Sequence, residues 1–314
     1  MTKPAILQLG PYPVWDQTVL DADYTVQRYD LADDKAAFLA QVGMDIRAIA
    51  TRGDLGASTT ILAACPNVEI IAVNGVGYDA VDMPTARARA IKVTNTPDVL
   101  TDDVADLAVG MLIMQARGMH GAEHWARSGD WATKGGYPLQ RKVTGLRVGI
   151  LGLGRIGLGI GRRLAGFEMD IAYSATAPKA GVTWDFFADP VALAARSDVL
   201  IMALAASPAT RHIVNAAVLA ALGPQGMLIN VSRAANVDEE ALLTALETGT
   251  LGAAALDVFE GEPRLNPRFT ALTNVLLQPH HASGTVETRR AMGQLMRDNL
   301  TAHFAGQPLL TPVI

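Results

Sequence analysis

Short apolar runs alternate with helix-length segments along almost the whole chain of 314 residues. The runs are nearly continuous in hydrophobicity, which is typical of strands that are buried on both faces of a parallel sheet. Because parallel neighbours need a crossover connection, usually a helix, the pattern predicts an α/β architecture. The expected strands are Ala5–Leu9, Ala48–Thr51, Glu69–Val73, Lys92–Asn95, Arg147–Leu151, Asp170–Ser174, Val199–Leu204, Met227–Val231, Ala254–Val258 and Val275–Gln278.

A chain of this length exceeds most single hydrophobic cores, so two domains are expected. The segment NTPDVLTDD, where a proline ends a strand and capping residues begin a helix, is interpreted as one crossing between them. Ser283-Gly284 is interpreted as the second crossing, and the tail Gln307–Ile314 is expected to lie back across the first domain. One domain is therefore inserted into the other. The predicted domains are 1–98 with 285–314, and 99–284.

The composition is that of an ordinary globular protein, with 50% hydrophobic and 18% charged residues. A net charge of −5 implies no general attraction to nucleic acid or to an anionic membrane surface. The single cysteine, Cys65, excludes an internal disulfide and is compatible with a reducing compartment. The first residues lack the pattern of a signal peptide, and no apolar stretch is long enough to span a bilayer. We expect a soluble cytoplasmic protein without nucleic-acid or membrane partners.

The segment GLGRIG has the spacing G-x-G-x-x-G, follows an apolar strand and opens a helical pattern. In this context Gly152 permits a tight turn, Gly154 lets the backbone approach a pyrophosphate, and Gly157 lets the helix pack closely on the strand. The N–H groups at the start of the helix would hold the phosphates. The sequence therefore predicts a dinucleotide site in the inserted domain. The residues expected to form it here are Gly152, Leu153, Gly154, Arg155, Ile156 and Gly157.

The end of the next expected strand bears on which dinucleotide is bound. An acidic residue there would bind the ribose 2′-OH of NAD, but the segment that runs from Ser174 through Ala175 and Thr176 to Lys179 has no carboxylate. Hydroxyl groups and a lysine suit a 2′-phosphate, so NADP is favoured. The arginine expected for NADP is missing too, which leaves NAD or dual use open.

Polar residues follow several of the expected strands. Ligands of an open parallel sheet bind beyond the carboxyl ends of its strands, so Arg233, Asp257 and His280 should face one crevice with Gly154. Arg233 directly follows Ser232 at a strand end, where an arginine can bind an anion. Glu262 is of interest because a carboxylate beside an imidazole favours the protonated ring and fixes its tautomer.

Five segments of the chain then resemble a known family in order and spacing: VTNTPDVLTDDVADLA, GILGLGRIG, NVSRAANVDEEAL, ALDVFEGEP and QPHHASGTVETR. They resemble the D-isomer-specific 2-hydroxyacid dehydrogenases, over essentially the whole chain and most closely the branch of glyoxylate/hydroxypyruvate and hydroxyphenylpyruvate reductases. The resemblance implies two doubly wound parallel-sheet domains, a Rossmann coenzyme domain inserted into a flavodoxin-like substrate domain. It also implies NAD(P)H-dependent reduction of a small 2-keto acid to the D-2-hydroxy acid, and a homodimer whose arm is 107–138.

The family's catalytic arginine, glutamate and histidine fall, by this resemblance, on Arg233, Glu262 and His280. The histidine of the family motif follows a proline, which selects His280 and makes His281 a neighbour. The family's arginine usually precedes a glycine, whereas Ala234 follows it here, a small change that could tighten the loop.

The same resemblance assigns residues around the substrate and the nicotinamide. The backbone N–H groups of Val76 and Gly77 would hold the substrate carboxylate, and Arg52 either assists them or is an ordinary solvated arginine. Asp257 would orient the nicotinamide carboxamide. The other residues expected at the nicotinamide are Val104, Val231 and Ser232.

Two other functions compete with this interpretation. HGAEH, at His120–His124, has the H-x-x-E-H spacing of some zinc peptidases, but no motif supplies a third ligand, so we expect a solvated helix or arm and no metal. A nucleotide-sensing transcriptional corepressor would share the fold without being an enzyme. The presence of Arg233, Glu262 and His280 together argues against it.

Overall fold

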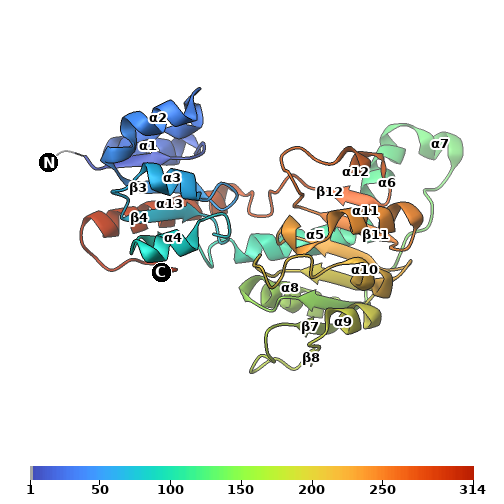
Figure 1. Cartoon of the computed structure of the whole chain (residues 1–314). Helices are drawn as coiled ribbons and strands as arrows, with labels where there is room; N and C mark the ends of the chain where they lie inside the picture. Colours follow the sequence, from blue (N-terminus) through green and yellow to red (C-terminus); the bar gives the residue numbers. More distant parts are fainter. Residues whose placement is uncertain (1–2) are drawn as a thin grey trace. The chain divides into compact units, whose positions relative to one another are not determined.

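The computed structural model describes residues 3–314, and the chain divides into two compact units (Figure 1). The terminal unit comprises the chain up to Leu100 together with Ser283–Ile314. The central unit is Thr101–Ala282. The central unit is thus inserted in sequence between the two parts of the terminal unit. Among residues 3–314, no helix combines the length and the apolar character needed to cross a lipid bilayer.

The terminal unit is built on a five-stranded parallel sheet with the order β2-β1-β3-β4-β5. This is the order 2-1-3-4-5 of flavodoxin-like folds. The strands are β1 (Ala5–Gln8), β2 (Thr25–Arg28), β3 (Ile46–Arg52), β4 (Ile70–Asn74) and β5 (Lys92–Thr94). The helices are α1 (Val14–Asp23), α2 (Lys35–Val42), α3 (Thr59–Ala64), α4 (Met83–Ala88) and α13 (Val286–Phe304), with short 3-10 turns η1 (Tyr29–Leu31) and η2 (Gly43–Asp45).

Both faces of this sheet are buried, which explains why its inner strands are apolar at consecutive positions. Leu7 of β1 packs in a cluster with residues of α2, α3 and α4, whereas its neighbour Ile6 packs with residues of α1 and α13. After α13 the chain returns to the sheet, where Val313 donates its N–H to the carbonyl oxygen of Val93 at 2.7 Å. The expected return of the tail is therefore confirmed.

The central unit is built on a seven-stranded parallel sheet with the order β12-β11-β10-β9-β6-β7-β8. The strands are β6 (Arg147–Leu151), β7 (Asp170–Ser174), β8 (Asp185–Phe186), β9 (Val199–Met202), β10 (Met227–Asn230), β11 (Ala253–Leu256) and β12 (Val275–Leu277). The order runs outward from β6 in both directions, as in the Rossmann fold. The predicted fold class, two doubly wound parallel-sheet units, is confirmed.

Helices cover both faces of the central sheet. The helix α8, whose Gly157 approaches Ile150 of β6, packs against α5. Residues of α9, α10, α11 and α12 pack in one cluster with Leu151 and Leu200, on the opposite face. The helices are α5 (Thr101–Ala116), α6 (Met119–Arg127), α7 (Asp130–Lys134), α8 (Arg155–Ala165), α9 (Pro190–Arg196), α10 (Ala216–Leu222), α11 (Glu239–Thr248) and α12 (Pro267–Ala271), with the 3-10 turn η3 (Ala234–Asn236).

Two strands were missing from the sequence prediction, and several predicted ends were wrong. Both missing strands, β2 and β8, lie at an edge of their sheet and carry exposed or half-buried side chains, so no apolar run marks them. Some residues just beyond a strand, such as Val231 and Val258, remain buried, which is why hydrophobicity alone extended the strands too far. The residues predicted in strands but found outside them are Leu9, Glu69, Asn95, Ala203, Leu204, Val231, Asp257, Val258 and Gln278.

The amino end of the central sheet is held by a carboxylate between two arginines. Asp198 accepts hydrogen bonds from the Nε and Nη2 of Arg147, both at 3.1 Å, and pairs with Arg141 at 3.1 Å. The hydrogen bonds from Arg147 hold the pKa of Asp198 below its usual range. A carboxyl group with a lowered pKa in the folded state stabilises the fold above its unfolded pKa, and this contribution is lost as pH falls through the folded value.

We therefore expect Asp198→Asn to lower the free energy of unfolding by about 1 kcal/mol near neutral pH, the usual net contribution of one intramolecular hydrogen bond, because the amide keeps one acceptor oxygen but loses the charge. Below about pH 4, where carboxyl groups take up protons, the difference from the wild type should shrink. Urea unfolding of both proteins between pH 7 and pH 3 measures this. A difference that stays constant over that range would contradict the assignment.

Candidate functional site

The glycine-rich turn between β6 and α8 has three glycines in three different surroundings. Gly152 has φ +94°, and a Cβ there would lie 2.7 Å from the Cβ of Leu204. A Cβ at Gly157 would lie 2.1 Å from the carbonyl oxygen of Gly152, so α8 packs against the turn itself. A Cβ at Gly154 would meet nothing within 4 Å, and no side chain caps the start of α8 there. The turn therefore fits a dinucleotide pyrophosphate, with an open backbone at Gly154 and helix N–H groups behind it.

The segment that follows β7 lies directly beside this turn, because Gly152 donates its N–H to the carbonyl oxygen of Ser174 at 2.9 Å. Ser174 is buried, Ala175 is half-buried, and Thr176 and Lys179 are exposed. The hydroxyl of Tyr173 accepts the backbone N–H of Lys179 at 2.8 Å, which folds the segment back on β7. The residues predicted for the ribose end of the cofactor thus lie next to those predicted for the pyrophosphate.

The turn after β10 carries Arg233 and is shaped by an asparagine. Asn230, the last residue of β10, accepts hydrogen bonds from the backbone N–H and the hydroxyl of Ser232 at 2.9 and 2.8 Å. Its side-chain amide donates to the carbonyl oxygen of Arg233 at 3.2 Å. The Arg233 side chain is half-buried, and its Nη1 donates to the carbonyl oxygen of Ser232 at 2.9 Å. Asn230 was not singled out from the sequence, although a polar residue closing an apolar strand is a signal for it.

The loops after β11 and β12 bring a carboxylate and an imidazole together. His280 donates from Nδ1 to Oε1 of Glu262 at 2.6 Å, and the two side chains are 36% and 29% exposed. The other carboxylate oxygen of Glu262 accepts the backbone N–H of Phe259 at 3.4 Å. With Nδ1 committed to the carboxylate, Nε2 is the ring nitrogen that can exchange a proton with a ligand.

Asp257 holds the backbone that follows His280. This carboxylate is 1% exposed, and its two oxygens accept the N–H groups of His281 at 2.9 Å and Ala282 at 3.0 Å. Burial raises the pKa of the Asp257 carboxyl group. Such a contact between a strand end and a distant loop leaves no mark in the sequence, so this use of Asp257 was missed.

The two adjacent histidines have different partners. The backbone of His280 is left-handed, with φ +50°, and its ring is turned to Glu262. The ring of His281 is exposed, and its Nε2 lies 2.7 Å from Oε1 of Gln278.

Two residues are predicted to line the nicotinamide ring, Val104 of α5 and Val231 after β10. Both are buried.

The residues predicted to bind the substrate carboxylate lie in the terminal unit, at the carboxyl edge of its sheet. Arg52 ends β3, opposite Asn74 at the end of β4, and Val76 and Gly77 follow β4. The side chain of Arg52 binds Asp54 through Nε at 3.0 Å. The carbonyl oxygen of Val76 accepts a hydrogen bond from the Asn95 side chain at 2.9 Å.

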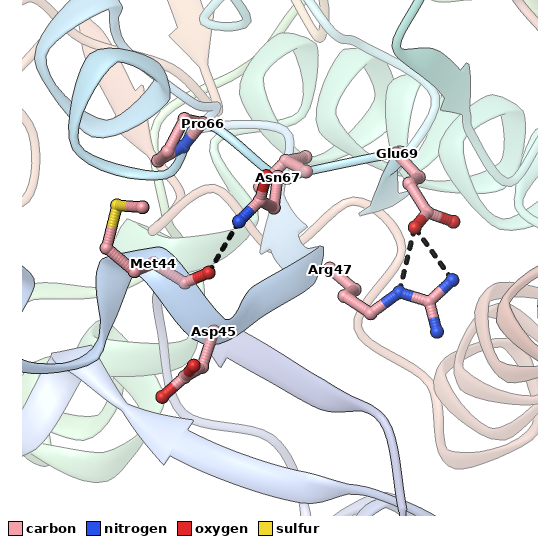
Figure 2. A pocket seen from close by; sticks show the side chains of 7 residues that line it. Met44, Asp45, Arg47, Pro66, Asn67 and Glu69 are labelled. Carbon is pink, nitrogen blue, oxygen red and sulfur yellow. Dashed lines mark hydrogen bonds and ion pairs between the residues drawn. The ribbon is translucent and has the colours of Figure 1, made fainter.

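A surface hollow at the opposite edge of the same sheet has polar and apolar lining residues, and two pairs of its polar groups bind each other (Figure 2). Nε of Arg47, near the start of β3, donates to Glu69 at 2.8 Å, and the side-chain amide of Asn67 donates to the carbonyl oxygen of Met44 at 2.7 Å. Ligands of parallel sheets bind at the carboxyl edge, and this hollow lies at the amino edge. Its position therefore differs from that of the ligand sites of such sheets.

The H-x-x-E-H segment lies on α6, where no residue is buried. His120 and His124 are exposed, and Glu123 pairs with Arg127 on the same helix. Across the described residues 3–314, no group of three or more histidine, cysteine, aspartate and glutamate side chains is arranged to hold a metal ion.

Comparison with known proteins identifies the family. Residues 109–282 match the family described as D-isomer specific 2-hydroxyacid dehydrogenase, NAD binding domain. The chain belongs to the D-isomer-specific 2-hydroxyacid dehydrogenases. This result confirms the family, the oxidoreductase activity and the nicotinamide dinucleotide cofactor that the sequence predicted. Neither alternative function, zinc peptidase or corepressor, gains support.

The similarity to known relatives extends over almost the whole chain. A 2-hydroxyacid dehydrogenase from Ketogulonicigenium vulgare Y25 is 67% identical with a TM-score of 0.93, over 100% of this chain and 99% of that chain. The NADPH-dependent glyoxylate/hydroxypyruvate reductase of Sinorhizobium meliloti, solved with NADP and malonate, is 42% identical with a TM-score of 0.92, over 99% and 97% of the two chains. The hydroxyphenylpyruvate reductase of Plectranthus scutellarioides is 42% identical over 314 residues, which is 100% of both chains.

The glycine turn of the dehydrogenase generates a paired prediction. Gly157→Ala places a methyl group against the carbonyl oxygen of Gly152, so it should lower stability by roughly 1–3 kcal/mol and weaken NADPH binding. Gly154→Ala meets no neighbour, so it should leave Tm almost unchanged yet weaken NADPH binding, because the methyl group stands where the pyrophosphate approaches. Thermal unfolding and NADPH titration measure both effects. Unchanged NADPH affinity in Gly154→Ala would remove this turn from the cofactor site.

Proposed function

We propose that the protein reduces a small 2-keto acid, such as glyoxylate or hydroxypyruvate, to the 2-hydroxy acid with NADPH, and that the product has the D configuration where it is chiral. The observation that carries this proposal is the hydrogen bond between His280 and Glu262, in the same unit as the glycine turn. Family membership and the name of the Sinorhizobium meliloti reductase support the reaction and the substrate class.

Reduction of a ketone needs a hydride and a proton, and a bound nicotinamide dinucleotide supplies the hydride. His280, protonated on both ring nitrogens, gives the proton on Nε2 to the oxygen of the former ketone. Glu262 keeps Nδ1–H in place through the transfer, so it orients the ring and stabilises its protonated form.

Arg233 binds the carboxylate of the substrate and polarises its ketone oxygen. A planar guanidinium can form two parallel hydrogen bonds with a carboxylate, which fixes the orientation of the keto group. Its positive charge also stabilises the negative charge that develops on the ketone oxygen.

The remaining assignments concern the nicotinamide and the terminal unit. Each carboxylate oxygen of Asp257 accepts one backbone N–H and still has a lone pair, so Asp257 can also accept a hydrogen bond from the carboxamide. Val104, Val231 and Ser232 belong to the same cofactor site in this proposal. We assign the terminal unit as the substrate domain, in which Arg52, Val76 and Gly77 bind the substrate. We assign 99–284 as the NAD(P)-binding domain.

The enzyme is proposed to be a cytoplasmic homodimer. Helices α6 and α7 and the segment that follows them carry large apolar side chains in contact with solvent, which is typical of a surface that binds a partner. Met119, Trp131 and Leu139 are 51%, 68% and 101% exposed. The single cysteine, Cys65, is buried and unpaired, as suits a reducing compartment.

The cofactor preference tests the proposed function directly. With glyoxylate or hydroxypyruvate as substrate, the purified enzyme should have a higher kcat/KM for NADPH than for NADH. The reason is that Ser174, Thr176 and Lys179 offer hydroxyls and a positive charge to a 2′-phosphate. Lys179→Ala should reduce kcat/KM with NADPH and leave kcat/KM with NADH almost unchanged. An equal or higher kcat/KM for NADH would contradict the predicted preference for NADPH. The absence of turnover with every 2-keto acid tested would refute the proposed function.

The two histidines give a second test. His280→Ala should lower kcat by about 10²–10⁴, the usual contribution of a positioned proton donor, while NADPH still binds at the glycine turn. His281→Ala should change kcat little, because its ring contacts Gln278 at the surface. Steady-state kinetics and NADPH titration of both variants measure this. The reverse ranking would show that His281 is the donor.

A further inference from the structure

The loop after β11, which carries Glu262, is hydrogen-bonded to the start of α11. The acceptor is a carboxylate that has no part in the proposed mechanism. Glu239, the first residue of α11, accepts the backbone N–H of Glu260 through Oε2 at 2.8 Å. Glu260 stands two residues before Glu262. The contact therefore fixes the start of the turn that presents Glu262 to His280.

The start of α11, where Glu239 lies, is held by hydrogen bonds of the residues around it. Asp238 caps α11 by accepting the N–H of Ala241 at 3.1 Å, and it donates its own N–H to the carbonyl oxygen of Val214 at 2.9 Å. Between Arg233 and this cap, the chain forms the short turn η3, where His212 donates its N–H to the carbonyl oxygen of Ala235 at 3.0 Å. The segments that carry Arg233 and Glu262 therefore meet at the bond from Glu260 to Glu239.

We propose that Glu239 is a positioning residue for the reaction: by accepting the N–H of Glu260, it holds the turn in which Glu262 reaches His280. This inference rests on the proposed function, in which His280 is the proton donor. Glu239 contacts neither substrate nor cofactor in this proposal, and it acts only through the placement of Glu262.

The surroundings of Glu239 agree with a role as an acceptor rather than as a charge. Burial raises the pKa of the Glu239 carboxyl group, the hydrogen bond from the N–H of Glu260 lowers it in part, and the charges of Glu260 and Glu240 raise it. A carboxyl group keeps a carbonyl oxygen that accepts a hydrogen bond whether or not it is ionised. The side chain of Glu260 has a partner of its own, since its Oε1 lies 3.8 Å from Nε2 of His212.

The variants of Glu239 separate the acceptor from the charge. Glu239→Ala removes the acceptor. Glu239→Asp keeps the charge, but its side chain is one methylene too short to reach the N–H of Glu260, so this variant replaces Glu239→Ala in the test if the alanine variant does not fold. Glu239→Gln keeps an oxygen at the same position. The matched control is Glu240→Ala: this neighbouring carboxylate on the same helix binds Arg268 of α12 instead, at 2.7 Å.

Without the acceptor, kcat should fall roughly five- to tenfold, the size expected for one lost hydrogen bond, while KM for NADPH stays within about twofold. The alkaline limb of the pH profile should begin at lower pH, as in Glu262→Gln, because an imidazolium that loses its carboxylate gives up its proton more readily. Glu239→Gln should restore both values, and Glu240→Ala should change neither. An unchanged pH profile in Glu239→Ala and Glu239→Asp, or no recovery in Glu239→Gln, would overturn the proposal.

A measurement without substrate keeps this test apart from that of the proposed function. The His280 ring resonance, assigned by its loss in His280→Ala, can be followed by NMR through a pH titration of the wild type and Glu239→Ala. Its titration midpoint should move to lower pH in the variant, and an unchanged midpoint would overturn the role of Glu239. A wild type that turns over no 2-keto acid would instead refute the proposed reaction and leave the titration result standing.

Discussion

All seven strands of the central sheet run in the same direction, so their carboxyl ends lie along one edge. Every loop that leaves this edge therefore starts beside the loops of its neighbours, however distant they are in sequence. The order of the strands reverses between β6 and β9, which is where such sheets bind ligands. The glycine turn follows β6 and therefore lies at this point, and the turns after β10, β11 and β12 supply Arg233, Glu262 and His280.

Three carboxylates hold these loops together by accepting N–H groups of the backbone. Asp257 binds the segment after His280, Glu262 binds the N–H of Phe259, and Glu239 binds the N–H of Glu260. Burial disfavours the charged form of a carboxylate, as the raised pKa values of Asp257 and Glu239 show, and the N–H donors offset part of that cost. A loop held by such bonds is set before a ligand arrives, which is what transfer of a proton over a short distance requires.

The parts of this arrangement that could be predicted from the sequence are those with a local signal. The strands β6 and β7 were predicted with their observed ends, because each is a short apolar run bounded by a turn. The glycine turn was predicted because each of its three glycines has a separate reason to be there, and the structure gives a steric reason for Gly152 and Gly157, while the backbone at Gly154 is open. The edge strands β2 and β8 have no such run, since an edge strand is only partly buried. The roles of Asn230 and Glu239 depend on which loops become neighbours, and no single segment of sequence carries that information.

The two adjacent histidines show how contacts give a physical reason for a choice that the sequence made only by its resemblance to a family motif. His280 and His281 are the same residue type at neighbouring positions, so composition and spacing alone cannot rank them. Asp257 takes the backbone N–H of His281, and the left-handed backbone of His280 turns its ring toward Glu262. A left-handed backbone is unfavourable for a residue with a Cβ and persists only where surrounding contacts impose it. The pairing with Glu262 and the bonds to Asp257 on the following residues are such contacts, and they commit one histidine to the carboxylate while the other stays at the surface.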